Sequence, residues 1–293
     1  MRHIDNNKVD KYNILILQDA ILDIALYIHN FCKKHNVEYC LMGGSALGAL
    51  RHHGFIPWDD DLDIFMTPEN YARFRELFRI EGDHSKFHLQ EMGQNSSSMI
   101  ASAKLRANNT AYIESAFSDM HIHHGIFVDI FILHNCPRAK WKQLLMVGAA
   151  KYLLLKGQSY KKVSYKGLKG VLLHCVRILP KNFLYRQALS MLYHYDDKES
   201  ELVCHLLGKA FYKKGIYRKK YFERSLCVPF EKVYLNIPVG AHEYLTERFG
   251  DYLKIPSEDS IKNAQHTNLW SSSEDFSCYT NTNRLFDEEW KLI

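Results

Sequence analysis

The segment at residues 37–66 constrains the fold of this 293-residue chain more than any other part of the sequence. A short apolar run predicts a strand at Val37–Leu41, and the Gly-Gly-Ser sequence at 43–45 predicts a tight turn before a helix that starts at Ala46. Acidic and apolar residues then alternate from Asp61 to Met66, as they do in a half-buried strand. This order of elements predicts a mixed α and β fold.

Periodicity predicts further elements on both sides of this segment. Apolar residues at spacings of three and four predict a helix at Ile14–Cys32, and the Thr-Pro-Glu sequence at 67–69 predicts the start of a helix that runs to Ile80. Three strands are expected farther along, at Met99–Arg106, Ala111–Glu114 and Ile126–Leu133. A polar loop at Gly93–Ser98 precedes them, and a short helix is expected near the end of the chain at Ala241–Phe249.

The acidic strand is the strongest indication of chemistry. Asp61 and Asp63 are two residues apart, so their side chains leave the same face of a strand and can converge on one hard cation. Four acids within residues 59–63 would repel one another in a common cleft, and a bound divalent ion would compensate this repulsion. A solvated acidic loop is the alternative, but such a loop would not alternate with Trp58 and Leu62. We therefore predict a Mg²⁺ (or Mn²⁺) site.

Two other features point to the same site. The turn at Gly44 and Ser45 lacks bulky side chains and precedes a helix, so its backbone N–H groups can approach a phosphate, although such a sequence also occurs in ordinary tight turns. Asp129 is embedded in the apolar strand Phe127–Phe131, where an acid is costly unless it is paired or bound to metal. A structural hydrogen-bonding role for Asp129 is the alternative.

Basic residues supply candidate ligands for an anionic substrate. Lys104 and Arg106 lie two apart on a predicted strand and can share a face that binds donor phosphates, or they can line a solvated strand edge. Arg51 is a candidate for the same cleft, with helix capping or packing as the alternative. The histidines at 121, 123 and 124 suggest zinc, yet no second Cys or His pair follows at a usual spacing.

The cysteines and the N-terminal sequence concern the compartment. Seven cysteines form no CxxC pair, an arrangement that argues against a disulfide framework and a thiolate zinc site. Asp5 and Asp10 precede the first apolar run, so the order of a secretory signal is missing. We expect a cytoplasmic protein with reduced cysteines.

A basic region interrupts the mixed pattern. Between Asp129 and Asp196 the chain has twelve Lys and Arg residues and no Asp or Glu. The runs Trp141–Lys156 and Leu168–Leu179 are helical in pattern, apolar and basic, but too short to span a bilayer. Peripheral contact through 141–186 with the inner face of the cytoplasmic membrane is one interpretation, and a helical subdomain with a solvated basic face is the other. Nucleic acid is not expected as a partner, because no nucleic-acid-binding motif accompanies the charge.

The motifs together resemble the LicD family of phosphocholine and related transferases, a nucleotidyltransferase-like branch that also includes fukutin-like proteins. The resemblance rests on residues 40–66, 103–106, 125–131, 228–231 and 237–252, and thus covers most of the chain outside the basic region. It implies an α/β (α+β) fold with a mixed sheet flanked by helices. After the third aspartate, residues 130–134 lack the proline and the second acid usual in the family.

The resemblance also implies roles for residues. It assigns the metal and catalytic roles to Asp61, Asp63 and Asp129, and substrate binding to Gly44 and Ser45. The basic residues Lys104 and Arg106 gain support as donor-phosphate ligands. The implied organisation is a catalytic core at 1–136, a basic helical insert at 137–195 and a C-terminal region at 196–293 that completes the core.

The reaction expected from the resemblance is metal-dependent transfer of a phospho-alcohol group from a CDP-linked donor, such as CDP-choline, to a hydroxyl of a cell-surface or lipid-linked glycan. Asp129 is the expected proton acceptor. Two alternatives remain open on the sequence. One is a nucleotidyltransferase that attacks an NTP and releases pyrophosphate, and the other is a non-catalytic glycan or membrane adaptor.

Overall fold

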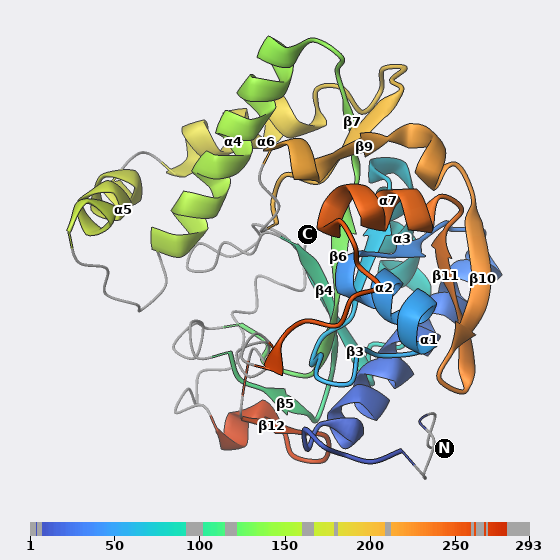
Figure 1. Cartoon of the computed structure of the whole chain (residues 1–293). Helices are drawn as coiled ribbons and strands as arrows, with labels where there is room; N and C mark the ends of the chain where they lie inside the picture. Colours follow the sequence, from blue (N-terminus) through green and yellow to red (C-terminus); the bar gives the residue numbers. More distant parts are fainter. Residues whose placement is uncertain are drawn as a thin grey trace.

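The computed structural model of the chain (Figure 1) describes residues 4, 8–91, 102–114, 122–159, 167–178, 181–208, 212–258, 261, 267 and 269–279. Its centre is a five-stranded mixed sheet with the strand order β1-β2-β6-β4-β3. β2 and β6 are parallel, and the other three neighbouring pairs are antiparallel. The strands are β1 (Cys40–Leu41), β2 (Asp63–Met66), β3 (Phe87–Gln90), β4 (Ala103–Ala107) and β6 (Phe127–Ile132).

The two faces of the sheet differ in chemistry because side chains alternate along each strand. Ile64, Val128 and Leu105 are buried on one face at an exposure of 1% or less, within the main hydrophobic core. Residues 63, 129 and 104 leave the opposite face. The predicted mixed sheet flanked by helices is confirmed, and the charged residues lie on one of its faces.

Helices surround the sheet. They are α1 (Leu15–His35), α2 (Gly43–His52), α3 (Pro68–Glu81) and α7 (Ala241–Phe249). Within the described residues, α1 is the one helix long and apolar enough to cross a membrane. Its apolar face instead packs in the core, against β4, β6 and the β10–β11 hairpin (Ser225–Phe230 and Val233–Pro238).

The basic region forms a separate helical layer, which projects from the sheet in Figure 1. Its helices are α4 (Lys140–Ser159), α5 (Leu168–Ile178) and α6 (Lys181–Tyr193). They lie between β7 (His134–Cys136) and β8 (Leu202–Cys204), which pair with each other and with β9 (Ile216–Arg218) in a small antiparallel sheet. Met146, Ala150 and Leu192 belong to a second hydrophobic cluster here. The helical pattern is confirmed, while the division into three regions stays a prediction.

The remaining elements are short. β5 (Ala111–Tyr112) pairs with β12 (Trp270–Ser271) in a separate two-stranded sheet, so a late segment of the chain joins the segment that follows β4. Three 3₁₀ turns are η1 (Tyr212–Gly215), η2 (Lys219–Phe222) and η3 (Phe276–Cys278).

The local predictions hold in part, and of the predicted strand Val37–Leu41 only Cys40–Leu41 is observed as a strand. Thr67 caps α3 by accepting a hydrogen bond from the Asn70 N–H, as the Thr-Pro-Glu sequence predicted. The predicted turn at 43–45 is wrong, because these residues form the first turn of α2, where Gly43 adopts a positive φ of 49°. The predicted strand at 61–66 begins only at Asp63. The expected loop Gly93–Ser98 and residues 99–101 of the next strand lie outside the described residues.

Candidate active site

A cavity of about 890 Å³ opens on the face of the sheet that carries the charged residues. Its walls come from β2, β4 and β6, from the start of α2, from α7 and from the insert helices α4 and α6. This volume suits a drug-sized ligand or a nucleotide, since pockets for such ligands commonly measure about 300–1,000 Å³. Seven of the eight predicted site residues line it: Gly44, Arg51, Asp61, Asp63, Lys104, Arg106 and Asp129.

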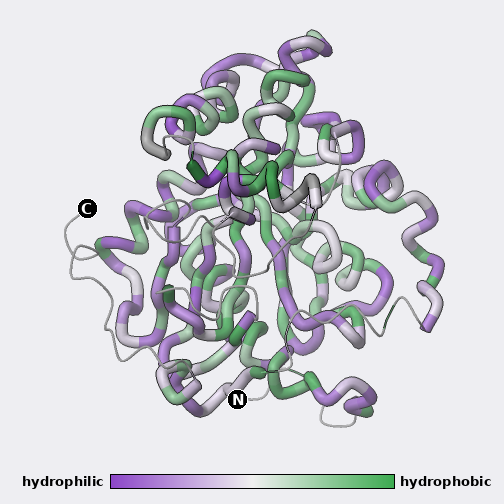
Figure 2. The backbone as a smooth tube through the Cα atoms, turned by 90° about the vertical axis from the view of Figure 1, so that its left-hand side faces the viewer, coloured by the Kyte–Doolittle hydropathy of each residue, from purple (hydrophilic) through white to green (hydrophobic). Residues whose placement is uncertain are grey.

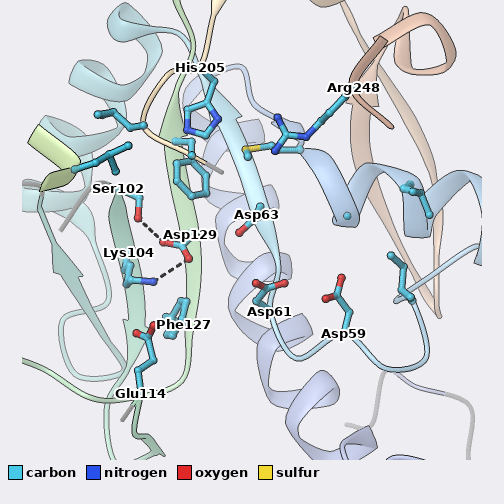
Figure 3. Close-up of a pocket in the computed structure, with 18 of the residues that line it drawn as sticks. Asp59, Asp61, Asp63, Ser102, Lys104, Glu114, Phe127, Asp129, His205 and Arg248 are labelled. Carbon is cyan, nitrogen blue, oxygen red and sulfur yellow. Dashed lines mark hydrogen bonds and ion pairs between the residues drawn. The ribbon is translucent and has the colours of Figure 1, made fainter. Parts of the chain in front are cut away.

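A row of charged residues crosses the floor of this cavity. Asp63 on β2 lies opposite Asp129 on β6, and Asp129 lies opposite Lys104 on β4. Residues paired across neighbouring strands point to the same face with their Cβ atoms about 5 Å apart. The sheet register therefore brings two acids and one base together (Figure 3).

Asp129 is held from the β4 side. Its Oδ1 accepts a hydrogen bond of 2.6 Å from the Ser102 hydroxyl, and its Oδ2 accepts one of 2.8 Å from the Lys104 ammonium. Both members of this ion pair are buried, with side-chain exposures of 8% for Lys104 and 11% for Asp129. The Asp129 carboxylate is thus paired with a cation and held in one orientation.

Phe127 separates the two cations of β4. The Lys104 Nζ lies 3.4 Å from the centre of the Phe127 ring, and the Arg106 guanidinium lies 4.7 Å from it. Arg106 also donates to the Gln90 side chain at 2.6 Å and to the Gly125 carbonyl at 2.8 Å. The predicted shared face of Lys104 and Arg106 is observed, but Arg106 is 1% exposed and is tied into the wall. Burial lowers the pKa of Arg106 to about 10, so it remains charged at neutral pH.

Three acids gather beside the row. Asp59, Asp61 and Asp63 all line the cavity, and Figure 3 shows their carboxylates along one wall. Burial raises the pKa of Asp63 well above its usual range, and the neighbouring negative charges, chiefly Asp61 and Asp129, raise it further. Lys104 opposes this shift. Negative charge therefore outweighs positive charge in the immediate surroundings of Asp63.

The loop before β2 directs its acidic side chains to two different places. Asp60 is 1% exposed and does not line the cavity; its Oδ2 accepts hydrogen bonds from the Tyr112 hydroxyl at 3.1 Å and the Thr267 N–H at 3.3 Å. Anchoring Asp60 on this side leaves its neighbours at 59 and 61 to face the cavity. The four acids at residues 59–63 therefore have two different roles: Asp60 anchors the loop, and the other three face the cavity.

Helix α2 supports the acidic loop. A Cβ atom on Gly44 would lie 3.0 Å from Asp59 Oδ2, so glycine permits this close approach. Ser45, predicted to bind substrate, does not line the cavity, and its Oγ accepts a hydrogen bond of 2.8 Å from the Asp63 N–H. Ser45 thereby fixes the start of β2. The N–H of Gly43 donates to the Tyr244 hydroxyl at 3.0 Å.

Arg51 lines the cavity. It donates to the backbone carbonyls of Tyr252 at 2.7 Å and Lys254 at 3.3 Å, and it stacks over Trp58 at 5.9 Å. These contacts join α2 to the segment after α7. The predicted packing role and the predicted cleft position are thus both present.

The donor set suits a divalent cation at one place. Asp61 and Asp63 supply hard oxygen ligands beside a surplus of negative charge, the chemistry that Mg²⁺ prefers. Asp129 differs because Ser102 and Lys104 already bind its oxygens. Within the described residues, no group of three His, Cys, Asp or Glu side chains is arranged to hold a metal. Asp61 and Asp63 therefore fit the predicted ion, and a ligand role for Asp129 stays a prediction.

The histidine cluster has structural contacts. His123 Nδ1 accepts from the Gly125 N–H at 2.9 Å, its Nε2 lies 3.0 Å from Asn108 Oδ1, and its ring stacks on His88. His124 is 2% exposed. His121 lies outside the described residues.

Sequence reasoning missed two residues of the site. Arg248 on α7 lines the cavity above Gly43 and faces Asp63 (Figure 3); its Nη1 donates to the Tyr217 hydroxyl at 2.8 Å, and its Nε is buried without a hydrogen-bond partner. His205, just after β8, lines the same cavity, and both of its buried ring nitrogens lack a partner. No local spacing marks either residue, since each reaches the site through a distant element.

A comparison with known protein families finds a match to one part of the chain. The model of the LicD/FKTN/FKRP nucleotidyltransferase domain family matches residues 36–135, which include the Gly-Ser element, Asp61, Asp63, Lys104 and Asp129. Residues 36–135 form a LicD-family domain.

Beyond the matched domain, the chain as a whole is similar to individual proteins. It is 28% identical over 253 residues to the lipopolysaccharide cholinephosphotransferase LicD of Haemophilus influenzae, which covers 84% of this chain and 93% of that protein. It is 38% identical over 58 residues to the human ribitol 5-phosphate transferase FKRP, which covers 20% of this chain and 12% of that protein. Both relatives are named as transferases of a phosphate-linked alcohol.

Proposed function

We propose that the chain is a phospho-alcohol transferase, which moves a group such as phosphocholine from a CDP-linked donor to a hydroxyl of a lipid-linked or cell-surface glycan. The named activities of its relatives support the reaction class. The observation that carries the proposal is the row Asp63–Asp129–Lys104 on the floor of a nucleotide-sized cavity.

The donor pyrophosphate would lie between the two cationic walls. Lys104 projects from β4 and Arg248 from α7, so the two cations flank the acidic row from opposite sides (Figure 3). Backbone N–H groups in the first turn of a helix have no partner within the helix, and this makes the Gly44 N–H a further phosphate ligand. Arg106 would strengthen the positive potential behind Phe127 without direct contact.

Asp61 and Asp63 would hold a divalent cation, Mg²⁺ or Mn²⁺. When bound, such an ion supplies charge neutralisation for phosphate oxygens and for the leaving nucleotide. The surplus of negative charge around Asp63 supports this role, because two unshielded anions, protein and donor, would otherwise repel each other. Ser45 would act by fixing the position of Asp63 through its backbone N–H.

Asp129 would accept the proton of the acceptor hydroxyl. The hydroxyl oxygen forms a bond to the phosphorus of the transferred group, the bond from that phosphorus to the CMP oxygen breaks, and CMP leaves with the bonding electrons. Each carboxylate oxygen of Asp129 keeps a second lone pair beyond its bond to Ser102 or Lys104. The fixed orientation of the carboxylate suits a general base.

The test is product analysis with defined donors. We expect CMP release and transfer of choline phosphate when the purified protein meets CDP-choline and an extract of bacterial glycolipids with Mg²⁺. Asp63→Asn should abolish transfer. Glu69→Gln is the control, because it removes an exposed acid on α3 that does not line the cavity, and it should retain transfer.

The alternatives predict different products. Release of pyrophosphate from CTP or ATP, without CMP from CDP-choline, would identify a nucleotidyltransferase and overturn the proposal. Donor binding without turnover of either nucleotide class would identify a non-catalytic adaptor. CMP release from CDP-ribitol but not from CDP-choline would keep the reaction class and change the alcohol.

A further inference from the structure

The outer face of α4 is apolar. Trp141, Leu144 and Leu145 are 63%, 56% and 48% exposed, and Gly148, also exposed, continues this stripe at helical spacing. The opposite face of α4 contributes Met146 and other residues to the second hydrophobic cluster. A helix of a water-soluble layer places polar residues outward, so an apolar stripe here requires a partner.

The neighbouring helices continue this character. On α5, Val171, Leu172 and Ile178 are 63%, 48% and 69% exposed, while Leu173 and Val176 face inward. Phe183 on α6 is 67% exposed. Both helices pack against α4. We call these seven residues the outer apolar surface: Trp141, Leu144, Leu145, Val171, Leu172, Ile178 and Phe183.

Positive charge accompanies this surface. Lys140, Arg177 and Arg186 are exposed on the same three helices, and no Asp or Glu occurs between Asp129 and Asp196. Figure 2 shows hydrophobic and hydrophilic segments side by side along these helices. Exposed apolar side chains among basic ones are the pattern of helices that rest on anionic lipid.

The same helices also border the active site. Lys151, Leu154 and Gln158 in the later turns of α4 and Tyr185 of α6 line the large cavity. One helical layer therefore carries both part of the cavity lining and the outer apolar surface. Whatever binds that surface lies beside the cavity.

We propose that the outer apolar surface binds an anionic phospholipid membrane, with its apolar side chains among the acyl chains and its basic side chains at the headgroups. The membrane is favoured over a second copy of the chain, because two copies would bring two acid-free basic surfaces together. Nucleic acid would satisfy the charge but not the exposed apolar residues. This inference concerns the surface alone and stands whether or not the proposed function holds.

Vesicle sedimentation tests the proposal. We expect the full chain to bind vesicles of phosphatidylcholine with phosphatidylglycerol, to bind phosphatidylcholine alone much less, and to bind less as salt screens the charges. The double variant Trp141→Ser and Leu145→Ser should lower the partition coefficient between vesicles and water about tenfold or more. Both substitutions remove apolar side chains that would be buried among the acyl chains. The pair Val171→Ser and Ile178→Ser, on a separate helix, should act in the same direction.

The control is Ile80→Ser on α3. Ile80 is 63% exposed, like Trp141 and Val171, but lies outside the insert, so its replacement should leave binding unchanged. Circular dichroism and thermal unfolding, both unchanged, would show that the insert variants fold. Equal binding to both vesicle types, no binding to either, or equal loss with Ile80→Ser would overturn the proposal. So would a dimer in lipid-free light scattering that the insert variants abolish, because the surface would then be a self-interface.

Discussion

The central sheet and the helical insert each bury a lysine, and they do so for different purposes. Lys104 on β4 is paired with the Asp129 carboxylate at 2.8 Å and faces the cavity. Lys156 on α4 is fully buried and donates instead to the backbone carbonyls of Val176 and Arg177, at the end of α5. The first lysine takes part in an ionic row, and the second caps a helix.

The comparison extends to the apolar residues of the two regions. In the core, the strands bury apolar residues on one face, and on the other face charged residues alternate with Phe65, Phe127 and Phe131. In the insert, charged side chains either join helices or face solvent, and large apolar side chains remain exposed. The core is thus organised around a polar cavity, and the insert around an outer surface.

The largest expected effect is on catalysis in the core. Asp63→Asn should lower transfer at least about 10²-fold, since it removes a group placed to stabilise charge in the transition state. Thermal stability should stay equal or rise, because the amide relieves a buried negative charge beside other acids. Paired measurements of CMP release and thermal unfolding test this, and a parallel loss of both would make Asp63 a structural residue.

A second prediction concerns the buried pair of the core. Lys104→Met should lower the free energy of unfolding by about 3 kcal/mol, because it leaves the Asp129 carboxylate buried without its cation. Adding Asp129→Asn to this variant should recover part of the loss. Urea unfolding of the single and double variants measures the coupling, and purely additive losses would contradict the ion pair.

Much of this core could be predicted from sequence because its signals are local. The Thr-Pro-Glu sequence fixed the start of α3, and the two-residue spacing placed Asp61 and Asp63 on one side. Asp129 was predicted from its apolar strand and from the resemblance. The start of β2 was misplaced, because the hydrogen bonds of Asp60 to Tyr112 and Thr267 hold that loop, and these partners are distant in sequence.

Other site features depend on tertiary structure. Spacing places Lys104 on a strand, but only the strand order β2-β6-β4 makes it the neighbour of Asp129. Arg248 sits on an amphipathic helix whose pattern indicates only packing, and its approach to Gly43 follows from the contact of α7 with α2. The burial of Lys156 could likewise not be predicted, because the sequence around it is uniformly basic.

The insert should respond to loss of its own buried lysine locally. Lys156→Met removes the two hydrogen bonds to the α5 carbonyls, and we expect a cost of about 1–3 kcal/mol for those buried acceptors. Hydrogen exchange should quicken in α5 while the amides of β2 and β6 keep their protection. Exchange that quickens equally in the sheet would show that the two hydrophobic clusters unfold as one unit.

Counted per pH unit, the smallest expected effect lies at the junction of the two regions, at His205. Burial, helped by the charge of Arg248 and by His134, lowers the pKa of His205 to about 3. The unfolded chain takes up this proton near pH ~6.5 and the folded chain does not. Stability from this group is therefore present above pH ~6.5 and falls as the pH drops toward 3.

His205→Phe should remove this slope, which amounts to at most about 1.4 kcal/mol per pH unit. Urea unfolding at a series of pH values below ~6.5 measures it. If His205→Phe leaves the slope unchanged, His205 takes up its proton in the folded chain, and the junction between sheet and insert must open to water at mildly acidic pH. That result would make this boundary, rather than either hydrophobic cluster, the place where the two regions separate.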